Sequence, residues 1–293
     1  MAYRTEIIPP ESAVDVHWSA TAKDPNDPRV VVDRARILAD AWRPAVHSRI
    51  EFICGRVAGR TVLDIGCVAH DEARMESSDW LHRRIAHLAA SCVGVDVLDE
   101  GVAAMTNAGF DAVCHDLSNG LGPLAARGPF QVMVAGELIE HVANLDMLFA
   151  AAAAGLAADG ELIITTPNPY APARVRAGRR GDVWENADHI MYAFPSGIAE
   201  LAARHGLVLA QAMTTEPTTR TLINPVRWVK RMIKGSQWHR RGFSTTVGVV
   251  RPVTLDRRDR LDQIRWKLSA KMSSSHQFIG ETFIYVIQRD TLL

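Results

Sequence analysis

The chain has 293 residues, and 47% of them are hydrophobic, so it can bury one large core with further chain to spare. Its 33 lysines and arginines balance 33 aspartates and glutamates, which argues against a global field that attracts nucleic acid or an anionic membrane. No signal-peptide pattern opens the chain and no apolar run approaches membrane-spanning length, so we expect a cytoplasmic protein without a transmembrane segment.

Hydrophobic periodicity predicts helices first and then an alternation of strands and helices. Residues 1–57 are expected to form a proline-containing arm and two helices that are interrupted near Pro44. Strands are predicted at 61–65, 92–96, 111–116, 130–136, 161–167, 207–214 and 281–289. Helices are predicted between them at 79–90, 99–109, 145–160 and 195–206. This alternation indicates an α/β protein with a Rossmann-like, doubly wound, seven-stranded and mainly parallel sheet covered by helices on both faces.

We expect residues 58–293 to form the main domain, with two insertions before the last strand. The insertions are 168–194 and 215–280, and long insertions at the ligand side of a sheet usually carry specificity. The second contains a basic stretch with two tryptophans at 227–241. It is expected either to bind a sugar, a nucleobase or a membrane surface, or to be an amphipathic helix that packs Trp228 inward.

The cysteine pattern fits a reducing compartment. Cys54, Cys67, Cys92 and Cys114 lie in apolar segments and have no C-x-x-C spacing. We therefore expect reduced core residues rather than disulfides or zinc ligands.

Three ionisable residues in "GELIEH" follow the strand predicted at 130–136. If this stretch is helical, Glu140 and His141 lie three and four residues after Glu137 and share one helical face. An ordinary first helical turn explains the same residues, since acidic side chains complement the positive end of the helix dipole. Ligands of doubly wound sheets bind beyond the carboxyl ends of the strands, which makes this stretch a candidate site.

Three strand ends, "VLDIGCVAHDEA" (62–73), "VGVDVLDE" (93–100) and "VCHDLSNG" (113–120), carry acidic residues in a recognisable pattern. Together they resemble the cofactor half of the class I S-adenosylmethionine-dependent methyltransferases, over roughly residues 55–215 and the last strand. The resemblance implies S-adenosyl-L-methionine as cofactor. The cofactor-binding residues that it implies are Asp64, Gly66, Asp96, Asp116, Leu117 and Glu137.

The resemblance also implies a role for each strand end. Asp64 orients the methionine end of the cofactor through water or the loop backbone, and the turn at Gly66 lets backbone N–H groups approach the ligand. Asp96 accepts hydrogen bonds from both ribose hydroxyls, as a carboxylate can. Asp116 receives the adenine amino group.

The loop at 66–78 departs from the family's D-x-G-x-G-x-G pattern, because only Gly66 is kept and Val68 and His70 follow. It must therefore hold the cofactor differently, with His70 or the "WLH" at 80–82 as candidates to close it. For His82 we expect a surface position on a helix instead. The lost glycines also leave open a non-catalytic protein that binds S-adenosylmethionine.

The E-x-x-E-H stretch, "ITTPN" (164–168) and "ADHIMYAF" (187–194) together resemble a metal-dependent subgroup of O-methyltransferases. This subgroup includes enzymes that act on the terminal 2′-hydroxyl of small RNAs and the catechol methyltransferases of ubiquinone synthesis. The resemblance implies a divalent cation, Mg²⁺ or Mn²⁺, that binds both hydroxyls of a vicinal diol. The metal ligands that it implies are Glu137, Glu140, His141 and His189. Two alternatives remain, in which His141 is a general base beside a catalytic Glu137 and His189 caps the helix near Pro195.

The acceptor is expected to be a small-molecule or oligosaccharide diol. The combination of "DIGCV" and "WLH" with the diol-site residues resembles actinobacterial sugar and polysaccharide O-methyltransferases. The 1-hydroxyl of a methylated mannoside is the most specific acceptor that it implies, with a catechol, a quinone precursor or an RNA 2′-hydroxyl as alternatives. We expect no nucleic-acid partner, because the net charge is zero and no RNA-binding module is recognisable, and a homodimer is left open.

Overall fold

The computed structural model describes residues 18, 21–68, 72–181, 186–215 and 280–290. The helices are α1 (Pro28–Ala41), α2 (Arg49–Val57), α3 (Leu81–Leu88), α4 (Asp99–Asn107), α5 (Leu145–Gly155), α6 (Pro172–Arg179) and α7 (Pro195–Arg204). The strands are β1 (Thr61–Ile65), β2 (Ser91–Asp96), β3 (Ala112–Cys114), β4 (Phe130–Gly136), β5 (Leu156–Pro167), β6 (Leu207–Thr214) and β7 (Thr282–Arg289). None of the described helices is long and apolar enough to cross a membrane.

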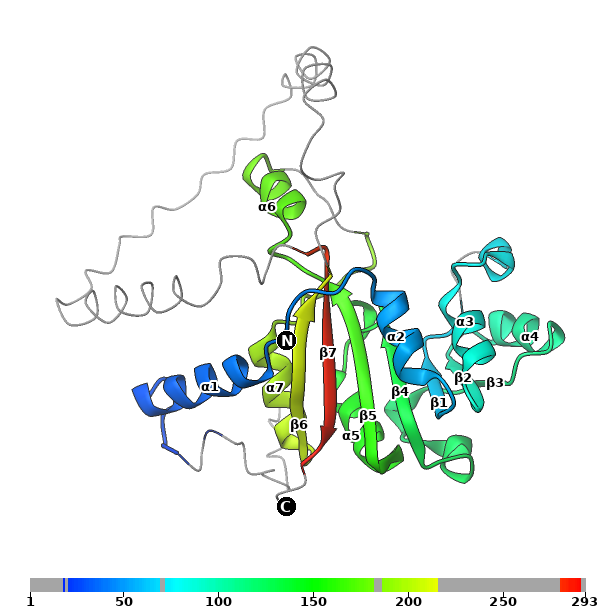
Figure 1. The fold of residues 1–293 in the computed structure, drawn as a ribbon, viewed down its shortest axis with the longest axis horizontal. Helices are drawn as coiled ribbons and strands as arrows, with labels where there is room; N and C mark the ends of the chain where they lie inside the picture. Colours follow the sequence, from blue (N-terminus) through cyan, green and yellow to red (C-terminus); the bar gives the residue numbers. More distant parts are fainter. Residues whose placement is uncertain (1–17, 19–20, 69–71, 182–185, 216–279, 291–293) are drawn as a thin grey trace, which may run out of the picture.

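The strands form one seven-stranded sheet in the order β3-β2-β1-β4-β5-β7-β6 (Figure 1). Each pair of adjacent strands from β3 to β5 in this order is parallel, whereas β7 runs antiparallel to both β5 and β6. The predicted seven-stranded, mainly parallel α/β architecture is therefore confirmed. The strand order reverses between β1 and β4, and ligands of doubly wound sheets bind outside the strand ends at such a point.

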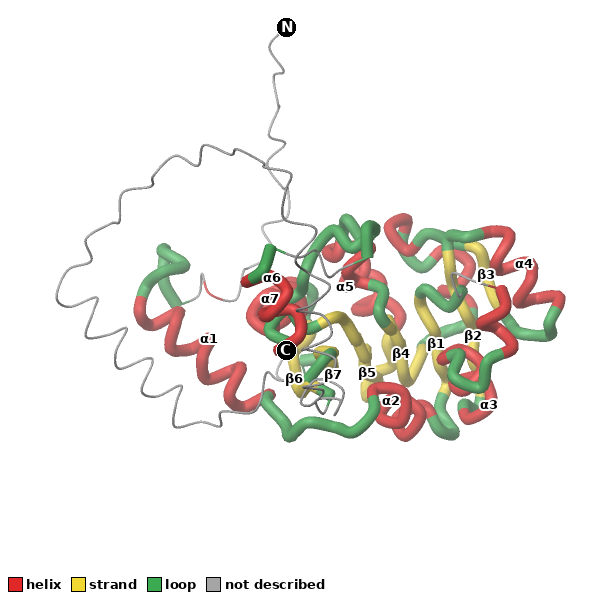
Figure 2. Tube along the Cα trace, turned by 90° about the horizontal axis from the view of Figure 1, so that it is seen from above, coloured by secondary structure: helices red, strands yellow, loops and turns green. Residues whose placement is uncertain are grey.

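Helices cover both faces of the sheet (Figure 2). On one face, α5 and α7 pack against residues such as Leu63 and Met133. On the other face, α2 and α3 pack against Val62 and Val132, the neighbours of those residues in sequence. Successive side chains of a strand point to opposite faces, so strands that are covered on both faces read as continuous apolar runs.

The N-terminal helices separate at the predicted break near Pro44. Isolated bridges join Trp42 to Ala212 and Val46 to Thr215, so the connection runs along β6. Arg34 of α1 forms an ion pair with Glu200 of α7. The helix α1 is thus held at the outer edge of the sheet, away from the strand ends of β1 to β4.

One predicted helix has the wrong end, and one short helix was not predicted. The Ala-rich helix predicted at 145–160 ends at Gly155, because Leu156 already pairs with Phe130 and opens the long strand β5. Sheet pairing here overrides the helix propensity of the alanines.

The insertion 168–194 contains a short helix, α6, that the periodicity did not predict. Of the insertion 215–280, only its two end residues are described, so the basic stretch 227–241 lies outside the described residues.

The four cysteines are free, as expected. Cys54 and Cys67 are buried and Cys92 is partly buried, but Cys114 is exposed. The prediction of a core position is therefore wrong for Cys114, because β3 is the edge strand of the sheet and none of its three residues is fully buried.

Candidate functional site

Two adjacent cavities lie at the carboxyl ends of β1, β2 and β4. Their volumes are about 680 Å³ and about 410 Å³. The lining residues that they share are Gly66, Asp96, Val97, Leu138 and His141. The larger one is also lined by Asp64 and Glu137. The smaller one is also lined by Asp116 and Leu117. All six residues that were implied to bind the cofactor therefore surround one continuous region.

Asp96 and Asp116 both use backbone donors to fix their carboxylates. Asp96 accepts the Val68 N–H with Oδ2 at 2.9 Å and the Leu98 N–H with Oδ1 at 3.1 Å. Asp116 accepts the Ser118 N–H at 2.8 Å, and this hydrogen bond lowers the pKa of Asp116 below its usual value. Each carboxylate oxygen can accept a further hydrogen bond. Both carboxylates are thus oriented by the backbone and able to accept hydrogen bonds from hydroxyl or amino groups of a nucleoside.

The turn after β1 requires glycine but does not present its first N–H groups to the cavity. Gly66 has a φ of 72°, and a Cβ atom there would lie 2.7 Å from Leu138 Cδ1. Its N–H donates to Val95 O at 2.8 Å, and the Val68 N–H is used by Asp96. These N–H groups tie the turn to β2. The loop continues into residues 69–71, which lie outside the described residues, so the approach of backbone N–H groups to the ligand stays a prediction. His70 lies outside the described residues.

His82 is buried, so the prediction of a surface position on a helix is wrong. It is 1% exposed, and its Nδ1 lies 2.9 Å from Asp64 Oδ2. Along α3, His82 stands three residues before the fully buried Ile85. That spacing places both on the inner helical face, which is the sequence signal that identifies His82 as buried.

The "GELIEH" stretch does not form an α-helix. Glu137 turns the chain with a φ of 54°, and a single 3₁₀ turn, η5 (Ile139–His141), follows. The Glu137 N–H donates to Thr165 O at 2.9 Å, which anchors the bend to β5. The predicted common α-helical face is therefore wrong. A bent backbone, not helical spacing, orients these side chains, and its left-handed residue carries strain of about 1–3 kcal/mol.

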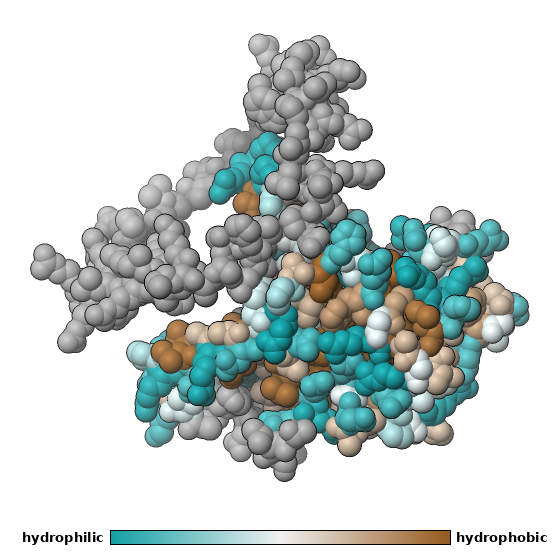
Figure 3. Space-filling model, viewed as in Figure 1, coloured by the Kyte–Doolittle hydropathy of each residue, from teal (hydrophilic) through white to brown (hydrophobic). Residues whose placement is uncertain are grey.

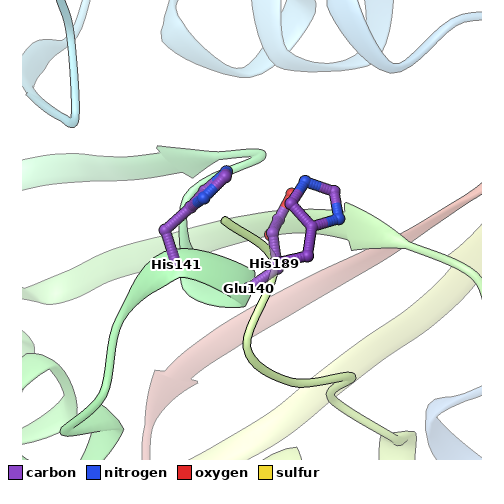
Figure 4. Close-up of side chains that lie close together, drawn as sticks. All are labelled: Glu140, His141 and His189. Atoms are coloured by element: carbon purple, nitrogen blue, oxygen red, sulfur yellow. The ribbon is translucent and has the colours of Figure 1, made fainter. Parts of the chain in front are cut away.

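Glu140, His141 and His189 nevertheless converge (Figure 4). One candidate ligand atom from each side chain lies within 4.8 Å of the other two. Figure 4 shows His189 arriving on the segment before α7, separate from the turn that carries the other two. The Ile190 N–H donates to Glu140 O at 2.9 Å and holds this segment against η5.

The carboxylates in this cluster are buried and only partly satisfied. Glu140 is 1% exposed, and its Oε2 accepts the Thr166 hydroxyl at 2.9 Å. Its Oε1 and the Oε1 of Glu137 are buried without a hydrogen-bond partner among the described residues. Burial, followed by the charge of Glu137, raises the pKa of Glu140 to about 7. Two buried carboxylate oxygens without donors leave negative charge that a cation would neutralise.

The histidines are oriented by neighbours that the sequence did not single out. His141 Nδ1 lies 3.2 Å from Asp188 Oδ2, and His189 Nε2 lies 3.4 Å from Asn186 Nδ2. The two imidazole rings stand edge to face with their centroids 4.8 Å apart. A carboxylate on the second nitrogen is typical of a metal-binding histidine. The donor set of carboxylate and imidazole fits Mn²⁺, Fe²⁺ or Co²⁺, and Mg²⁺ less well.

A family model described as a methyltransferase domain matches residues 35–212 of the chain. The chain belongs to this methyltransferase family. S-adenosyl-L-methionine is accordingly the cofactor of this methyltransferase, and the two cavities with their three strand-end aspartates fit it.

Several solved methyltransferase structures are similar to this chain at low sequence identity. An S-adenosylmethionine-dependent methyltransferase from Archaeoglobus fulgidus is 13% identical, with a TM-score of 0.48 over 88% of this chain and 94% of that chain. A TehB-like methyltransferase from Corynebacterium glutamicum is 17% identical, with a TM-score of 0.43 over 89% and 96%. A phosphoethanolamine N-methyltransferase from Haemonchus contortus, in complex with S-adenosylmethionine, is 14% identical, with a TM-score of 0.42 over 83% and 52%. No curated protein matched the chain.

Proposed function

We propose that this methyltransferase methylates a hydroxyl of a vicinal diol on a sugar or oligosaccharide. A divalent cation, Mg²⁺ or Mn²⁺, assists the reaction and is held by Glu137, Glu140, His141 and His189. The observation that carries the proposal is the convergence of Glu140, His141 and His189 beside two buried carboxylate oxygens that have no donor among the described residues.

The proposed site adjoins the cofactor region. Glu137 and His141 both line the larger cavity, together with Asp64 and Asp96. An acceptor oxygen near His141 therefore lies near the cofactor as well. Alignment of this kind can supply about 7–11 kcal/mol of the barrier to a bimolecular transfer.

In the reaction, an acceptor oxygen attacks the methyl carbon, the carbon–sulfur bond breaks, and the acceptor proton leaves. A bound divalent cation supplies Lewis acidity that lowers the pKa of a hydroxyl. The carboxylates of Glu137 and Glu140 provide the negative charge for that cation. Asp188 orients the imidazole of His141, which either holds the cation or accepts the proton, because one nitrogen cannot do both.

Two exposed aromatic rings, on the segments that follow β5 and precede α7, support a sugar acceptor. Tyr170 and Phe194 are 49% and 42% exposed, and their ring centroids lie 5.7 Å apart. Aromatic faces present apolar area against which a sugar ring packs. The neighbouring helix α6 carries Arg176 and Arg179 in its last turn, and its visible surface is mainly hydrophilic (Figure 3). Within this class, the 1-hydroxyl of a methylated mannoside is the acceptor that we propose.

The test is a methyl-transfer screen with methylated mannosides, other diol sugars, a catechol and an RNA with a free 3′ end. Each acceptor is assayed in EDTA, with Mg²⁺ and with Mn²⁺. We expect transfer to the sugar, loss of transfer in EDTA, and recovery with metal. Full activity in EDTA would overturn the metal site, and selective methylation of the catechol or RNA would overturn the acceptor. Tight cofactor binding without transfer to any diol would favour the non-catalytic alternative.

A further inference from the structure

The buried pair formed by Asp64 and His82 has no part in the proposed acceptor chemistry. Asp64 on β1 is 3% exposed and His82 on α3 is 1% exposed. Their hydrogen bond of 2.9 Å joins Asp64 Oδ2 to His82 Nδ1. Both residues nevertheless line the larger cavity. A polar pair that is buried this deeply and still borders a ligand cavity points to a function in binding.

The fold makes a fitted space for the imidazole. Gly94 lies beside Asp64 in the sheet. A Cβ atom at Gly94 would lie 2.9 Å from His82 Cε1, so any larger residue would displace the ring. The rings of Trp80 and Phe110 stand 5.3 and 5.4 Å from the imidazole, centroid to centroid. Packing on these sides restricts the ring to one orientation.

In the described part of the turn beside this pair, the first backbone N–H groups already have partners within the protein. The N–H groups of Gly66 and Val68 donate to Val95 O and Asp96 Oδ2. A loop with a single glycine at its start also cannot bring its backbone as close to a ligand as a glycine-rich loop can. We therefore expect side chains to bind the cofactor's amino-acid end, and Asp64 is a buried carboxylate that lines the cavity.

We propose that His82 is a positioning residue, which holds the Asp64 carboxylate in the orientation that binds the cationic methionine end of S-adenosylmethionine. The Nδ1–H of His82 donates to Oδ2, and the other carboxylate oxygen is left for the cofactor. A carboxylate that is held before binding loses less freedom on binding, which raises affinity. The inference rests on the cofactor and is independent of the metal and of the acceptor.

The test compares three variants by isothermal titration with S-adenosylhomocysteine and by thermal unfolding. His82→Asn keeps an N–H donor near the position of Nδ1, whereas His82→Phe keeps a ring and removes the donor. His87→Asn is the matched control, because His87 is an exposed histidine on the same helix. We expect His82→Phe to weaken binding about tenfold to a hundredfold, as for loss of a hydrogen bond to a charged group. We expect His82→Asn to retain most of the affinity and His87→Asn to retain all of it.

Unchanged affinity in His82→Phe would overturn the proposal. Equal losses of affinity in both His82 variants, matched by equal losses of melting temperature, would assign His82 to packing alone and overturn it too. If His82→Phe does not fold, ¹⁵N-histidine NMR of the unaltered protein decides, with the His82 signals assigned from the Asn variant. We expect a protonated Nδ1 whose signal shifts at saturating S-adenosylhomocysteine. An unprotonated Nδ1, or signals that the ligand leaves unchanged, would contradict the proposal.

Discussion

Replacing Glu140 by glutamine is expected to stabilise the metal-free protein while it weakens metal binding. Glu140 is 1% exposed and one of its oxygens has no donor among the described residues. Burial raises the pKa of Glu140 from 4.5 to about 7, and at about 1.4 kcal/mol per pKa unit the buried charge costs about 3 kcal/mol. Glutamine removes that charge but leaves an unpaired amide that costs about 1 kcal/mol or more. We therefore expect a net gain of about 1–2 kcal/mol.

The sign of the pH dependence follows from the raised pKa. A carboxyl whose pKa is higher in the folded state destabilises the fold only when it is ionised. The cost of Glu140 is therefore absent below pH 4.5, grows as the pH rises towards about 7, and is complete above that value. In EDTA, the gain from Glu140→Gln should be present at pH 8 and small or absent at pH 5.

The assay is thermal unfolding at both pH values, in EDTA and in excess Mn²⁺. A gain of 1 kcal/mol corresponds to about 2–4 °C for a domain of 150–250 residues. Added Mn²⁺ should stabilise the unaltered protein more than the variant, because ligand binding to the folded state stabilises it by mass action. Glu51→Gln is the control, since Glu51 is exposed on α2. If the unaltered protein and Glu140→Gln had equal melting temperatures in EDTA at pH 8, or if Mn²⁺ stabilised both equally, this reasoning would be refuted.

Three further predictions concern single residues of the site. Asp96→Ala should weaken S-adenosylhomocysteine binding, measured by titration, by about 1.5–3 kcal/mol for each hydrogen bond lost; unchanged affinity would contradict the ribose role. Glu137→Gly should unfold at the same or a higher temperature, because glycine relieves a φ of 54°, yet it should lose methyl transfer. Tyr170→Ala should raise the acceptor KM and leave cofactor affinity unchanged; a loss of cofactor affinity would instead assign this segment to the cofactor.

The strand-end acids were recognisable in the sequence because each lies at or near the end of a predicted strand, in a pattern that resembles the methyltransferase family. Asp64, Asp96 and Asp116 border the same pair of cavities. In a parallel sheet the carboxyl ends of the strands meet at one edge, so strand assignment alone brings such residues together. The seven strands followed from the same apolar runs, which both faces of a covered sheet require.

Other features depend on contacts between segments that are distant in sequence. Sheet pairing with Phe130 turned the end of an Ala-rich helical pattern into β5. Anchoring of Glu137 to Thr165 on β5 replaced an expected α-helix with a bend and a 3₁₀ turn. Local propensity is weak compared with pairing and burial, so neither change was visible in the local pattern.

The sequence by itself determined the residue types of the candidate metal site and the place of Glu137, Glu140 and His141 directly after the fourth strand. Only the tertiary structure decided that Glu140, His141 and His189 face one another and that Asp188 orients one imidazole. Only it decided that His82 is buried against Asp64, in the space left by Gly94 on another strand. The physical reason is that spacing along a strand or helix fixes direction within one element, whereas burial and partners depend on how separate elements pack.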